Sequence, residues 1–291
     1  MTLFLTGSES FIGKNLIRLC TAAGTPVTGI DSVPASAKGF VQGDILDPAV
    51  ADAIPEGATV VHLAAISRDP DCRADPKRAF DVNVGGTLNL AAAAKRRKAA
   101  QFIFASSEWV YGDVRNDEVQ VESQPIDLTG MKSEYAITKL VGEQLLKLDK
   151  GLEAVTVLRF GIVYGPRAQN WSAVEALANN VYRGNEIKVG SAKTARRFIH
   201  VDDICSGILA AQGRRGFEIF NLSGDTLVSL GDVVRTASEI LGKQTAVGES
   251  DPEKPSVRNP DNKKVRAELK WQPKLDIRAG LTTVLDFFAK Q

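Results

Sequence analysis

The sequence predicts an α/β fold in which a doubly wound parallel sheet is joined by a smaller, discontinuous α+β domain. In the first half of the chain, short apolar runs flanked by glycine or polar residues alternate with segments of helical periodicity. The candidate functional motifs all follow predicted strands, and doubly wound sheets bind their ligands at the carboxyl ends of strands. With 291 residues, 44% of them apolar, the chain is long enough for a large domain with an appendage.

Four short apolar segments in the first half of the chain, and one just beyond it, are predicted to be buried parallel strands. They are Leu3–Thr6, Pro26–Ile30, Val60–Ala64, Phe102–Ser106 and Val155–Phe160. Helices are predicted between them, at Phe11–Ala23, Pro76–Lys95 and Glu134–Leu148. This alternation of strand and helix is typical of a parallel sheet with helices on both faces.

The pattern becomes less regular after Gly165 and Pro166. The elements predicted there are helices at Trp171–Arg183, Asp202–Gln212, Val228–Leu241 and Ile277–Lys290, and strands at Arg197–Val201 and Phe217–Leu222. We therefore expect one domain over 1–164 and 196–222, and a second domain, which caps the sheet, over 165–195 and 223–291.

Composition limits the classes of function. The formal net charge is +1, from 36 basic and 35 acidic residues, so no long-range field favours nucleic acid or an anionic membrane. The three cysteines, Cys20, Cys72 and Cys205, form no CxxC pair, which favours free thiols in a reducing compartment. With only His62 and His200, we expect no histidine-based metal centre. The sequence has no apolar run of membrane-spanning length and no leader pattern, so the expected location is the cytoplasm.

A glycine-containing turn, with the sequence TGSESFIG, connects the first predicted strand to the first predicted helix. Gly7 permits a tight turn, Gly13 permits close packing of helix on strand, and the helix N-terminus faces a phosphate. Ser10 stands where dinucleotide-binding loops usually have a middle glycine. Because an ordinary strand–helix turn also explains the segment, the motif alone is weak evidence for a nucleotide.

Asp31 lies 18 residues beyond Gly13 at the end of the second predicted strand, where a carboxylate can accept hydrogen bonds from ribose hydroxyls. The same carboxylate would repel the 2′-phosphate of NADP, so this residue favours NAD. The alternative for Asp31 in isolation is an aspartate that stabilises its own turn. Asp44 and Ile45, which follow a third strand, have the same two interpretations, contact with an adenine or a turn.

Tyr135 and Lys139 are four residues apart in a predicted helix, so they lie on one face of it. A tyrosine is a poor base near its reference pKa of about 10, but a neighbouring cation stabilises the phenolate. Ser107 lies 28 residues upstream of Tyr135, at the strand end where the nucleotide is expected, and its hydroxyl can hydrogen-bond a substrate oxygen. A surface Tyr–Lys pair would explain the spacing alone, whereas the three residues together predict a catalytic site.

Nine segments, in order along the chain, carry a resemblance to a known family. They are TGSESFIG, GDILD, HLAA, VNVGGT, SSEWVYG, YAITK, LRFGIVYGPR, RRFIHVDD and AELKWQP, and they cover nearly the whole chain. The sequence resembles the extended short-chain dehydrogenase/reductase family, in particular its NAD-dependent nucleotide-sugar epimerases and dehydratases. The resemblance implies a Rossmann fold for the first domain, NAD as the cofactor, and a nucleotide-diphosphate sugar as the substrate of the second domain.

The resemblance also assigns roles to single residues. The cofactor-binding set, including the residues discussed above, is Gly7, Ser10, Phe11, Ile12, Gly13, Asp31, Asp44, Ile45, Leu63, Ala64, Ala65, Asn83, Tyr135 and Lys139. The catalytic residues are Ser107, Tyr135 and Lys139, and Lys139 also contacts the nicotinamide ribose. Besides Ser107, the substrate is held by Arg196 and Arg258, because a guanidinium can donate two hydrogen bonds to a diphosphate. For either arginine, a surface salt bridge is the alternative.

Three positions depart from the usual pattern or complicate it. Ser10 replaces a glycine, and Ile162 stands where an asparagine that contacts the nucleotide sugar is common. Glu108 follows Ser107 in a loop that is acidic in related dehydratases and decarboxylases, but Trp109 stands where hexose 4,6-dehydratases have a second acid. Glu108 is therefore either a catalytic or substrate-orienting carboxylate, or an exposed loop residue.

The favoured function is an NAD-dependent epimerase that acts on a nucleotide-diphosphate sugar through a transient keto intermediate. The alternatives are a dehydratase, or a net dehydrogenase or reductase, on the same scaffold, and a non-catalytic NAD-binding regulator. Helices Pro76–Lys95 and Glu134–Leu148 carry small and apolar residues beyond one core-facing stripe. Since the matching helices of this family pair across a two-fold axis, we expect a homodimer. The residues do not specify the sugar or the nucleotide base.

Overall fold

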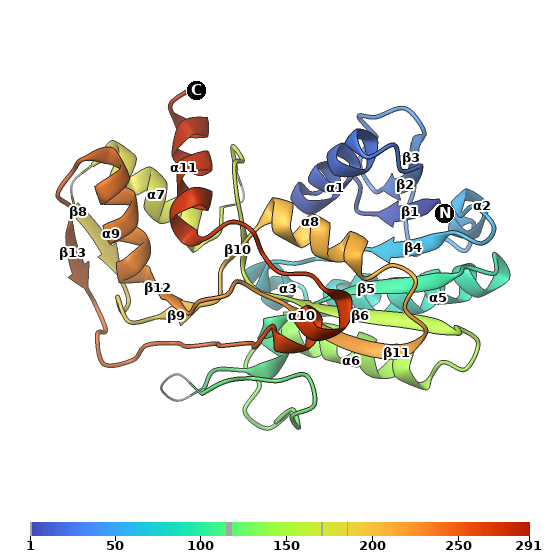
Figure 1. Ribbon diagram of the computed structural model, residues 1–291. Helices are drawn as coiled ribbons and strands as arrows, with labels where there is room; N and C mark the ends of the chain where they lie inside the picture. The colour runs from blue at the N-terminus through green and yellow to red at the C-terminus, as the bar shows by residue number, and fades with distance from the viewer. Residues whose placement is uncertain (1, 115–117, 170, 185) are drawn as a thin grey trace. The chain divides into compact units, whose positions relative to one another are not determined.

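The computed structural model describes residues 2–114, 118–169, 171–184 and 186–291 (Figure 1). The chain forms two compact units, which we call unit 1 and unit 2. Unit 1 comprises Met1–Gly112, Pro125–Arg159 and Cys205–Phe220, and unit 2 comprises Asp113–Gln124, Phe160–Ile204 and Asn221–Gln291. In these bounds, 113–124, 160–164, 196–204 and 221–222 group with unit 2, whereas the sequence predicts them in the first domain.

A seven-stranded sheet forms the centre of unit 1, with the strand order β11-β6-β5-β4-β1-β2-β3. Its strands are β1 (Leu3–Thr6), β2 (Val27–Asp31), β3 (Phe40–Gln42), β4 (Thr59–His62), β5 (Gln101–Ser107), β6 (Ala154–Phe160) and β11 (Gly216–Leu222). β1 pairs in parallel with β2 and β4, and the parallel pairing continues to β3 and β5. The strand order changes direction between β1 and β4, which is the switch point where such sheets bind ligands.

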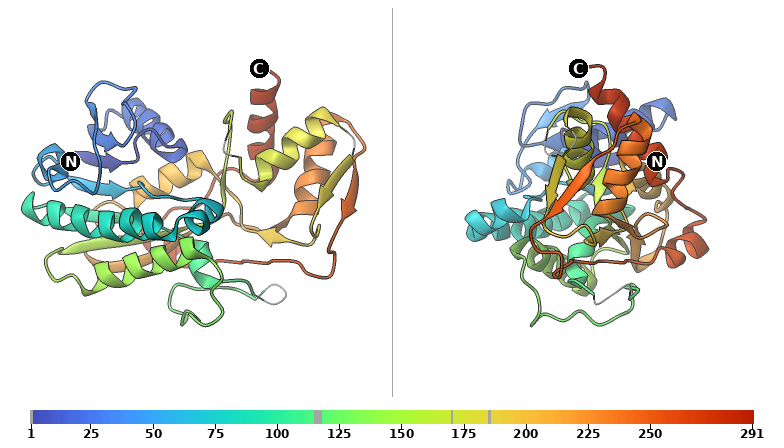
Figure 2. Two further views of the ribbon diagram at one scale, coloured as in Figure 1. Left: turned by 180° about the vertical axis from the view of Figure 1, so that it is seen from behind. Right: turned by 90° about the vertical axis from the view of Figure 1, so that its left-hand side faces the viewer.

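Helices cover both faces of this sheet. They are α1 (Phe11–Ala22), α2 (Val50–Ala53), α3 (Asp69–Ala74), α4 (Pro76–Phe80), α5 (Gly86–Arg96), α6 (Glu134–Leu148) and, in part, α8 (Val201–Ala210). α5 and α6 pack side by side on one face, and α1 lies on the other (Figures 1 and 2). Among the described residues, no helix has the length and apolar character needed to cross a membrane.

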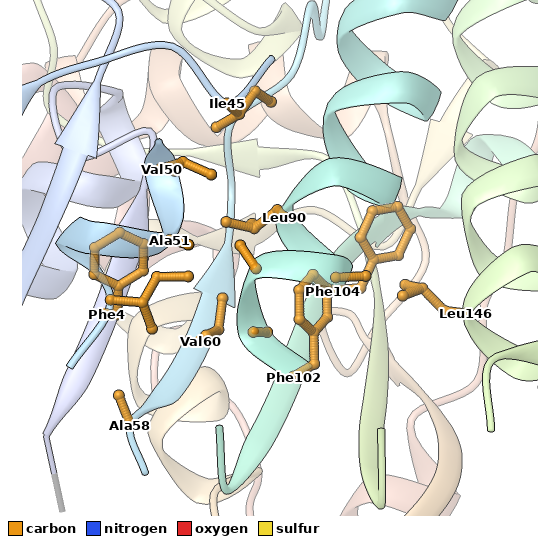
Figure 3. Close-up of a cluster of buried hydrophobic side chains, with 14 of the residues drawn as sticks. Phe4, Ile45, Val50, Ala51, Ala58, Val60, Leu90, Phe102, Phe104 and Leu146 are labelled. Atoms are coloured by element: carbon orange, nitrogen blue, oxygen red, sulfur yellow. The ribbon is translucent and has the colours of Figure 1, made fainter. Parts of the chain in front are cut away.

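The first hydrophobic core lies between the sheet and the helices α5 and α6 (Figure 3). Phe4 and Val60 project from neighbouring strands, Phe102 and Phe104 from β5, and Leu90 from α5. All five side chains are fully buried. This packing holds α5 and α6 against the strands whose ends carry the predicted site.

The predicted helix Pro76–Lys95 is interrupted by a π-helical turn over Asp81–Gly85, between α4 and α5. Such turns are rare and occur frequently at functional sites. This one carries Asn83, which is 1% exposed. Immediately after the turn, Gly86 packs on Ile45, and a Cβ there would lie 2.5 Å from the isoleucine Cδ1. The prediction of helical structure over Pro76–Lys95 is therefore confirmed, but the prediction of one continuous α-helix is wrong.

Unit 2 is an α+β unit, in agreement with the predicted fold class. Its helices are α7 (Ala173–Arg183), α9 (Leu230–Leu241), α10 (Lys263–Leu269) and α11 (Ile277–Phe288). Its short strands pair as β7 (Val163–Tyr164) with β10 (Ile199–His200), β8 (Glu186–Val189) with β13 (Ala246–Glu249), and β9 (Ala195–Arg196) with β12 (Val228–Ser229). α7, α9 and α11 pack together around a second core that includes Leu177, Val233 and Leu281.

Candidate active site

The structure brings the three predicted catalytic residues together in unit 1. Ser107 is the last residue of β5, and its hydroxyl lies close enough to the phenol of Tyr135 to lower the pKa of that phenol. Tyr135 and Lys139 lie one turn apart in α6. The Lys139 Nζ lies 5.8 Å from the centre of the Tyr135 ring and 4.9 Å from the centre of the Phe104 ring. A hydroxyl, a phenol and an ammonium therefore share one site, as a joint role in proton transfer requires.

Burial determines the proton affinities in this site. It raises the pKa of Tyr135 above its usual value, and the hydrogen bond with Ser107 acts in the opposite direction. Burial lowers the pKa of Lys139 to about 8, although the nearby Cys72 and Glu143 favour the charged form. At neutral pH, Lys139 is therefore an ammonium and Tyr135 a neutral phenol. A further cation beside the phenol would lower its pKa toward the range in which it can take a proton.

We expect Lys139 to titrate near pH 8 in the cofactor-free protein, because burial favours the neutral amine. Its proton is lost as the pH rises through that value, well below the ordinary lysine pKa of about 10.4. Carbon-13 NMR of labelled lysines should show one such resonance, which Lys139→Met removes and Lys77→Met, at an exposed site, leaves in place. A Lys139 resonance that titrates with the other lysines would contradict this expectation.

The start of α6 is held by a chain of hydrogen bonds to α3. Ser133 precedes the helix, and its hydroxyl accepts from the Ala136 N–H at 3.0 Å and lies 2.5 Å from Asp69 Oδ1. Arg73 donates to the other oxygen of Asp69 at 2.8 Å. Because Tyr135 belongs to the first turn of α6, this chain fixes the segment from which the phenol projects.

A buried ion pair follows Lys139 along the same helix. Glu143, one turn further on, accepts hydrogen bonds from Arg159 of β6 at 3.0 and 2.6 Å, and from Ser106 at 2.5 Å. The Arg159 side chain is 3% exposed and the Glu143 side chain 0%. The guanidinium also lies 4.7 Å from the centre of the Tyr111 ring. These contacts fix α6 against the sheet with no net buried charge.

Asn83 connects the π-helical turn to the catalytic helix. Its side-chain oxygen accepts from the Ile66 N–H at 2.8 Å, and its amide donates to the Ile66 carbonyl at 2.9 Å. The same amide donates to Thr138 Oγ1 at 3.0 Å, and Thr138 donates to the Tyr135 carbonyl at 2.8 Å. The side chain of this predicted cofactor residue therefore binds the chain itself and positions the loop after β4.

His62 adds a second buried chain, and the direction of each hydrogen bond in it can be deduced. Thr87 Oγ1 donates its single hydroxyl proton to the Asn83 carbonyl at 2.6 Å, because a carbonyl can only accept. Thr87 Oγ1 is therefore the acceptor in its hydrogen bond with His62 Nε2 at 2.9 Å. Thr6 Oγ1 accepts from the Ala64 N–H at 3.2 Å and donates to His62 Nδ1 at 2.8 Å. Burial lowers the pKa of His62 to about 3, so the ring is neutral and carries its proton on Nε2.

The loop after β1 forms a cradle that fits a dinucleotide phosphate. Gly7 has a φ of +75°, and a Cβ there would lie 2.9 Å from the Ala64 nitrogen. A Cβ on Gly13 would lie 2.2 Å from the Gly7 carbonyl oxygen. α1 begins at Phe11, and Ser10 caps it by accepting from the Gly13 N–H at 3.0 Å. The first-turn amides of a helix have no partner within the helix and favour an anion, so these residues fit the pyrophosphate of NAD.

Asp31 ends β2 and is anchored to this loop. Its Oδ2 accepts from the Glu9 N–H at 2.8 Å, and its Oδ1 accepts from the Val33 N–H at 3.3 Å. Each carboxylate oxygen has more than one acceptor position, so both remain able to accept a ribose hydroxyl. The turn that the sequence suggested as an alternative is thus present and compatible with a ribose contact.

The remaining predicted cofactor residues follow β3 and β4. Leu63–Ala65 lie directly after β4 and are partly buried. Asp44 is exposed, and its Oδ1 accepts from the Leu46 N–H at 2.9 Å, so it stabilises a turn. Ile45 is 6% exposed and belongs to the first core. The turn at Asp44 is therefore present, and contact of Asp44 and Ile45 with an adenine stays a prediction.

Glu108 is fully buried, so its interpretation as an exposed loop residue is wrong. The chain leaves β5 at Ser107 and enters a 3-10 turn over Glu108–Tyr111, whose Val110 and Tyr111 pack inward. The Trp109 N–H donates to Ser107 Oγ at 3.3 Å. The turn thus carries the carboxylate inward, immediately after the serine of the site.

The two arginines predicted to bind substrate lie together in unit 2, although 62 residues separate them in the sequence. Arg258 Nε lies 3.2 Å, and an Arg196 terminal nitrogen 4.0 Å, from the same oxygen of Asp113. Arg196 also donates to the Ser256 carbonyl at 2.6 Å. The side chains of Arg196 and Arg258 are only 11% and 9% exposed, so neither is a typical surface salt bridge. Ile162 packs against the second core.

Residues 3–223 match the NAD dependent epimerase/dehydratase family. The chain belongs to this family. It is 26% identical to the GDP-6-deoxy-D-mannose reductase of Pseudomonas aeruginosa, over 97% of this chain and 95% of that protein. The structure of MoeE5 in complex with UDP-glucuronic acid and NAD has a TM-score of 0.87 and 25% identity, covering 100% of this chain and 99% of that one.

A further similar structure is RMD from Pseudomonas aeruginosa complexed with NADPH, with a TM-score of 0.81, 26% identity and 99% coverage of both chains. Other relatives are named dTDP-glucose 4,6-dehydratase, UDP-glucuronic acid decarboxylase and UDP-glucose 4-epimerase. The predicted family, the Rossmann fold and NAD as the cofactor are confirmed. Because the relatives are named for four kinds of reaction, membership defines the scaffold and the class of enzyme.

The buried residues that support the site were not predicted from the sequence. Arg159 lies in an otherwise apolar strand, and a buried charge requires a partner. Glu143 lies one helical turn beyond Lys139, on the buried face of α6, and could have been recognised as that partner. His62 ends the buried strand β4, and a buried polar ring in that position requires hydrogen-bond partners.

Proposed function

We propose that the protein is an NAD-dependent epimerase that acts on a nucleotide-diphosphate sugar through a transient keto intermediate. The observation that carries this proposal is the single site formed by Ser107, Tyr135 and Lys139. Relatives named for reactions of UDP-, GDP- and dTDP-linked sugars support the class of substrate. A non-catalytic regulator would have no need for a hydroxyl, a phenol and an ammonium in one place.

In the proposed mechanism, Tyr135 Oη takes the proton of a sugar hydroxyl while Ser107 hydrogen-bonds the same sugar oxygen. NAD, when bound, would supply the hydride acceptor for that sugar carbon and a positive charge in addition to that of Lys139. Lys139 stabilises the phenolate, because a cation near a phenol favours the charged form. After the keto sugar turns over, the carbon regains the hydride on its opposite face and Tyr135 returns the proton to the oxygen.

The residues that would hold the ligands follow from the contacts described above. The helix N-terminus at Phe11 and Ile12 would bind the pyrophosphate of NAD, and Asp31 the adenosine ribose. Arg196 and Arg258 would bind the diphosphate of the sugar nucleotide, for which their guanidinium groups are suited. Asp113 would then release part of its interaction with them.

The buried Glu108 favours a dehydratase as the second candidate function. After oxidation of the sugar, elimination of water next to the ketone needs a proton donor, and a carboxyl group in the turn after Ser107 could supply it. A net dehydrogenase or reductase, which would simply release the oxidised or reduced sugar, is the third candidate. All three use the same first step.

Incubation of the enzyme and NAD with a panel of nucleotide sugars, followed by mass spectrometry, tests these functions. An epimerase gives a product of unchanged mass that separates from the substrate on chromatography. Loss of water identifies a dehydratase, and loss of two hydrogens identifies a dehydrogenase. Absence of any product across UDP-, GDP- and dTDP-linked sugars would contradict the proposed substrate class.

We expect Glu108→Gln to cause a measurable but partial loss of activity, because the amide keeps the shape and part of the hydrogen bonding of a group that orients the sugar. A general acid contributes typically about 10²–10⁴-fold to a rate, so its removal would be more severe. Steady-state kinetics on the identified substrate measures this difference. A loss of several hundredfold with hydride transfer preserved in a single turnover would favour the dehydratase, whereas full activity would exclude both roles.

We also expect a homodimer, formed through the outer surfaces of α5 and α6. Phe80, Leu88 and Leu148 are 40%, 44% and 70% exposed and would be covered in such a dimer. They belong to α4, α5 and α6. These helices correspond to the predicted helices Pro76–Lys95 and Glu134–Leu148, for which the family resemblance implies pairing across a two-fold axis. Light scattering at micromolar concentration measures the assembly, and a monomeric mass would contradict this expectation.

A further inference from the structure

The carboxylate of Glu9 occupies a group of anion-binding atoms beside Asp31. Glu9 is in the loop after β1, and its N–H donates to Asp31 Oδ2 at 2.8 Å. Its Oε1 accepts from the Ser36 N–H at 2.7 Å, and both its carboxylate oxygens lie 2.9 Å from Ser36 Oγ. Lys14 Nζ of α1 lies 3.0 Å from Oε2. A backbone amide, a hydroxyl and an ammonium thus surround one carboxylate.

These three groups are of the kind that proteins use to bind phosphate. In this protein they are satisfied by a carboxylate of the chain itself. The Ser36 N–H, followed by Lys14, lowers the pKa of Glu9, although burial opposes the shift, so the group is charged at neutral pH. The Glu9 side chain is 9% exposed and that of Lys14 is 56% exposed, so the carboxylate is enclosed and the ammonium reaches it from solvent.

We propose that Glu9 determines the choice of cofactor together with Asp31, by occupying the groups that would otherwise bind the 2′-phosphate of NADP. This inference rests on the placement of the adenosine ribose at Asp31 proposed above. The 2′-phosphate of NADP is attached to that ribose, and the hydrogen bond from the Glu9 N–H joins the backbone of Glu9 to the Asp31 carboxylate. Both carboxylates repel the phosphate, while Ser36 and Lys14 are already engaged.

Glu9→Ala removes the internal anion and leaves Ser36 and Lys14 able to bind a phosphate. We expect the Kd for NADP, measured by calorimetry, to fall by roughly tenfold or more, and the Kd for NAD to change by less than about threefold. The gain in NADP affinity should diminish as the salt concentration rises. Glu9→Gln, which keeps the shape and removes only the charge, should give a smaller change in the same direction.

Lys14 provides the matched controls. Lys14→Met in the Glu9→Ala background should remove most of the gain in NADP affinity, because the ammonium is the strongest of the freed phosphate ligands. Lys14→Met in the otherwise unaltered protein should leave the ratio of the two Kd values unchanged, since Glu9 already engages that ammonium. If both Glu9 variants weaken NAD and NADP equally, Glu9 only supports the loop and the proposal is overturned.

Asp31→Asn separates this inference from the ribose placement on which it rests. We expect it to raise the affinity for NADP independently of Glu9. A gain with Asp31→Asn but none with either Glu9 variant would overturn the role of Glu9 and leave the ribose placement intact. No gain with any of these variants would overturn the placement of the ribose at Asp31 as well.

Discussion

Tyr135→Phe is expected to abolish turnover and to leave the fold and the affinity for NAD nearly intact. The substitution removes only the phenol oxygen, which the proposed mechanism uses both to take and to return a proton. Loss of such a group typically lowers a rate by about 10²–10⁴-fold, and more where no other group can substitute. The aromatic ring remains in place next to Lys139, so packing is preserved. Kinetics on the identified sugar nucleotide and calorimetry with NAD measure the two effects.

Tyr182→Phe is the matched control, because Tyr182 is exposed in α7 of unit 2 and makes no contact that the mechanism uses. It should retain full activity. Thermal unfolding of both variants tests whether the loss in Tyr135→Phe has a structural cause. Undiminished turnover in Tyr135→Phe would rule out the phenol as the proton carrier.

Glu143→Gln should lower the free energy of unfolding by about 3–5 kcal/mol, because it leaves the charge of Arg159 buried without its counterion. Glutamine retains the shape of the side chain and an acceptor for Ser106. The decrease in the free energy of unfolding therefore reports the removal of the negative charge alone. Urea denaturation, followed by fluorescence or circular dichroism, measures the change.

An exposed pair and a double variant serve as controls for this prediction. Lys98→Met removes the surface ion pair with Glu56 and should leave the unfolding midpoint unchanged. The double variant Glu143→Met and Arg159→Met should recover much of the lost stability, since apolar side chains of similar volume can replace a buried pair. A loss below about 1 kcal/mol in Glu143→Gln, the range of exposed pairs, would contradict the structural role of the ion pair.

The elements that were predicted closely are those that carry their own local signals. Helix α6 has the predicted bounds Glu134–Leu148, because Ser133 caps its start and its apolar positions repeat with helical period. The interruption over Asp81–Gly85 could not be predicted from periodicity, since Asn83 is held by partners at Ile66 and Thr138 far away in the sequence. Likewise, β8 and β13 pair across about sixty residues and are mostly exposed, so no apolar pattern indicated them.

In the candidate site, too, residues with a local sequence pattern could be predicted, whereas contacts between segments distant in the sequence could not. Ser107, Tyr135 and Lys139 could be identified because their chemistry and their spacing are visible in the sequence. The contacts of Glu9 with Ser36 and of Arg258 with Asp113 could not, because they depend on how distant loops approach each other. The burial of Glu108 was missed for a related reason, since a carboxylate after a strand is more often exposed than enclosed.

The hydrogen-bond chain through His62 cannot conduct a proton. It begins at an amide N–H, that of Ala64, and ends at the carbonyl of Asn83, and neither group can exchange its role as donor or acceptor. Each hydrogen bond that links Thr6, His62 and Thr87 therefore has a single fixed direction from donor to acceptor. Reversal of any one bond would leave a buried group unsatisfied, so the chain acts as a rigid tie between the loop after β4 and the π-helical turn. Any exchange of the Tyr135 proton with solvent must take another route.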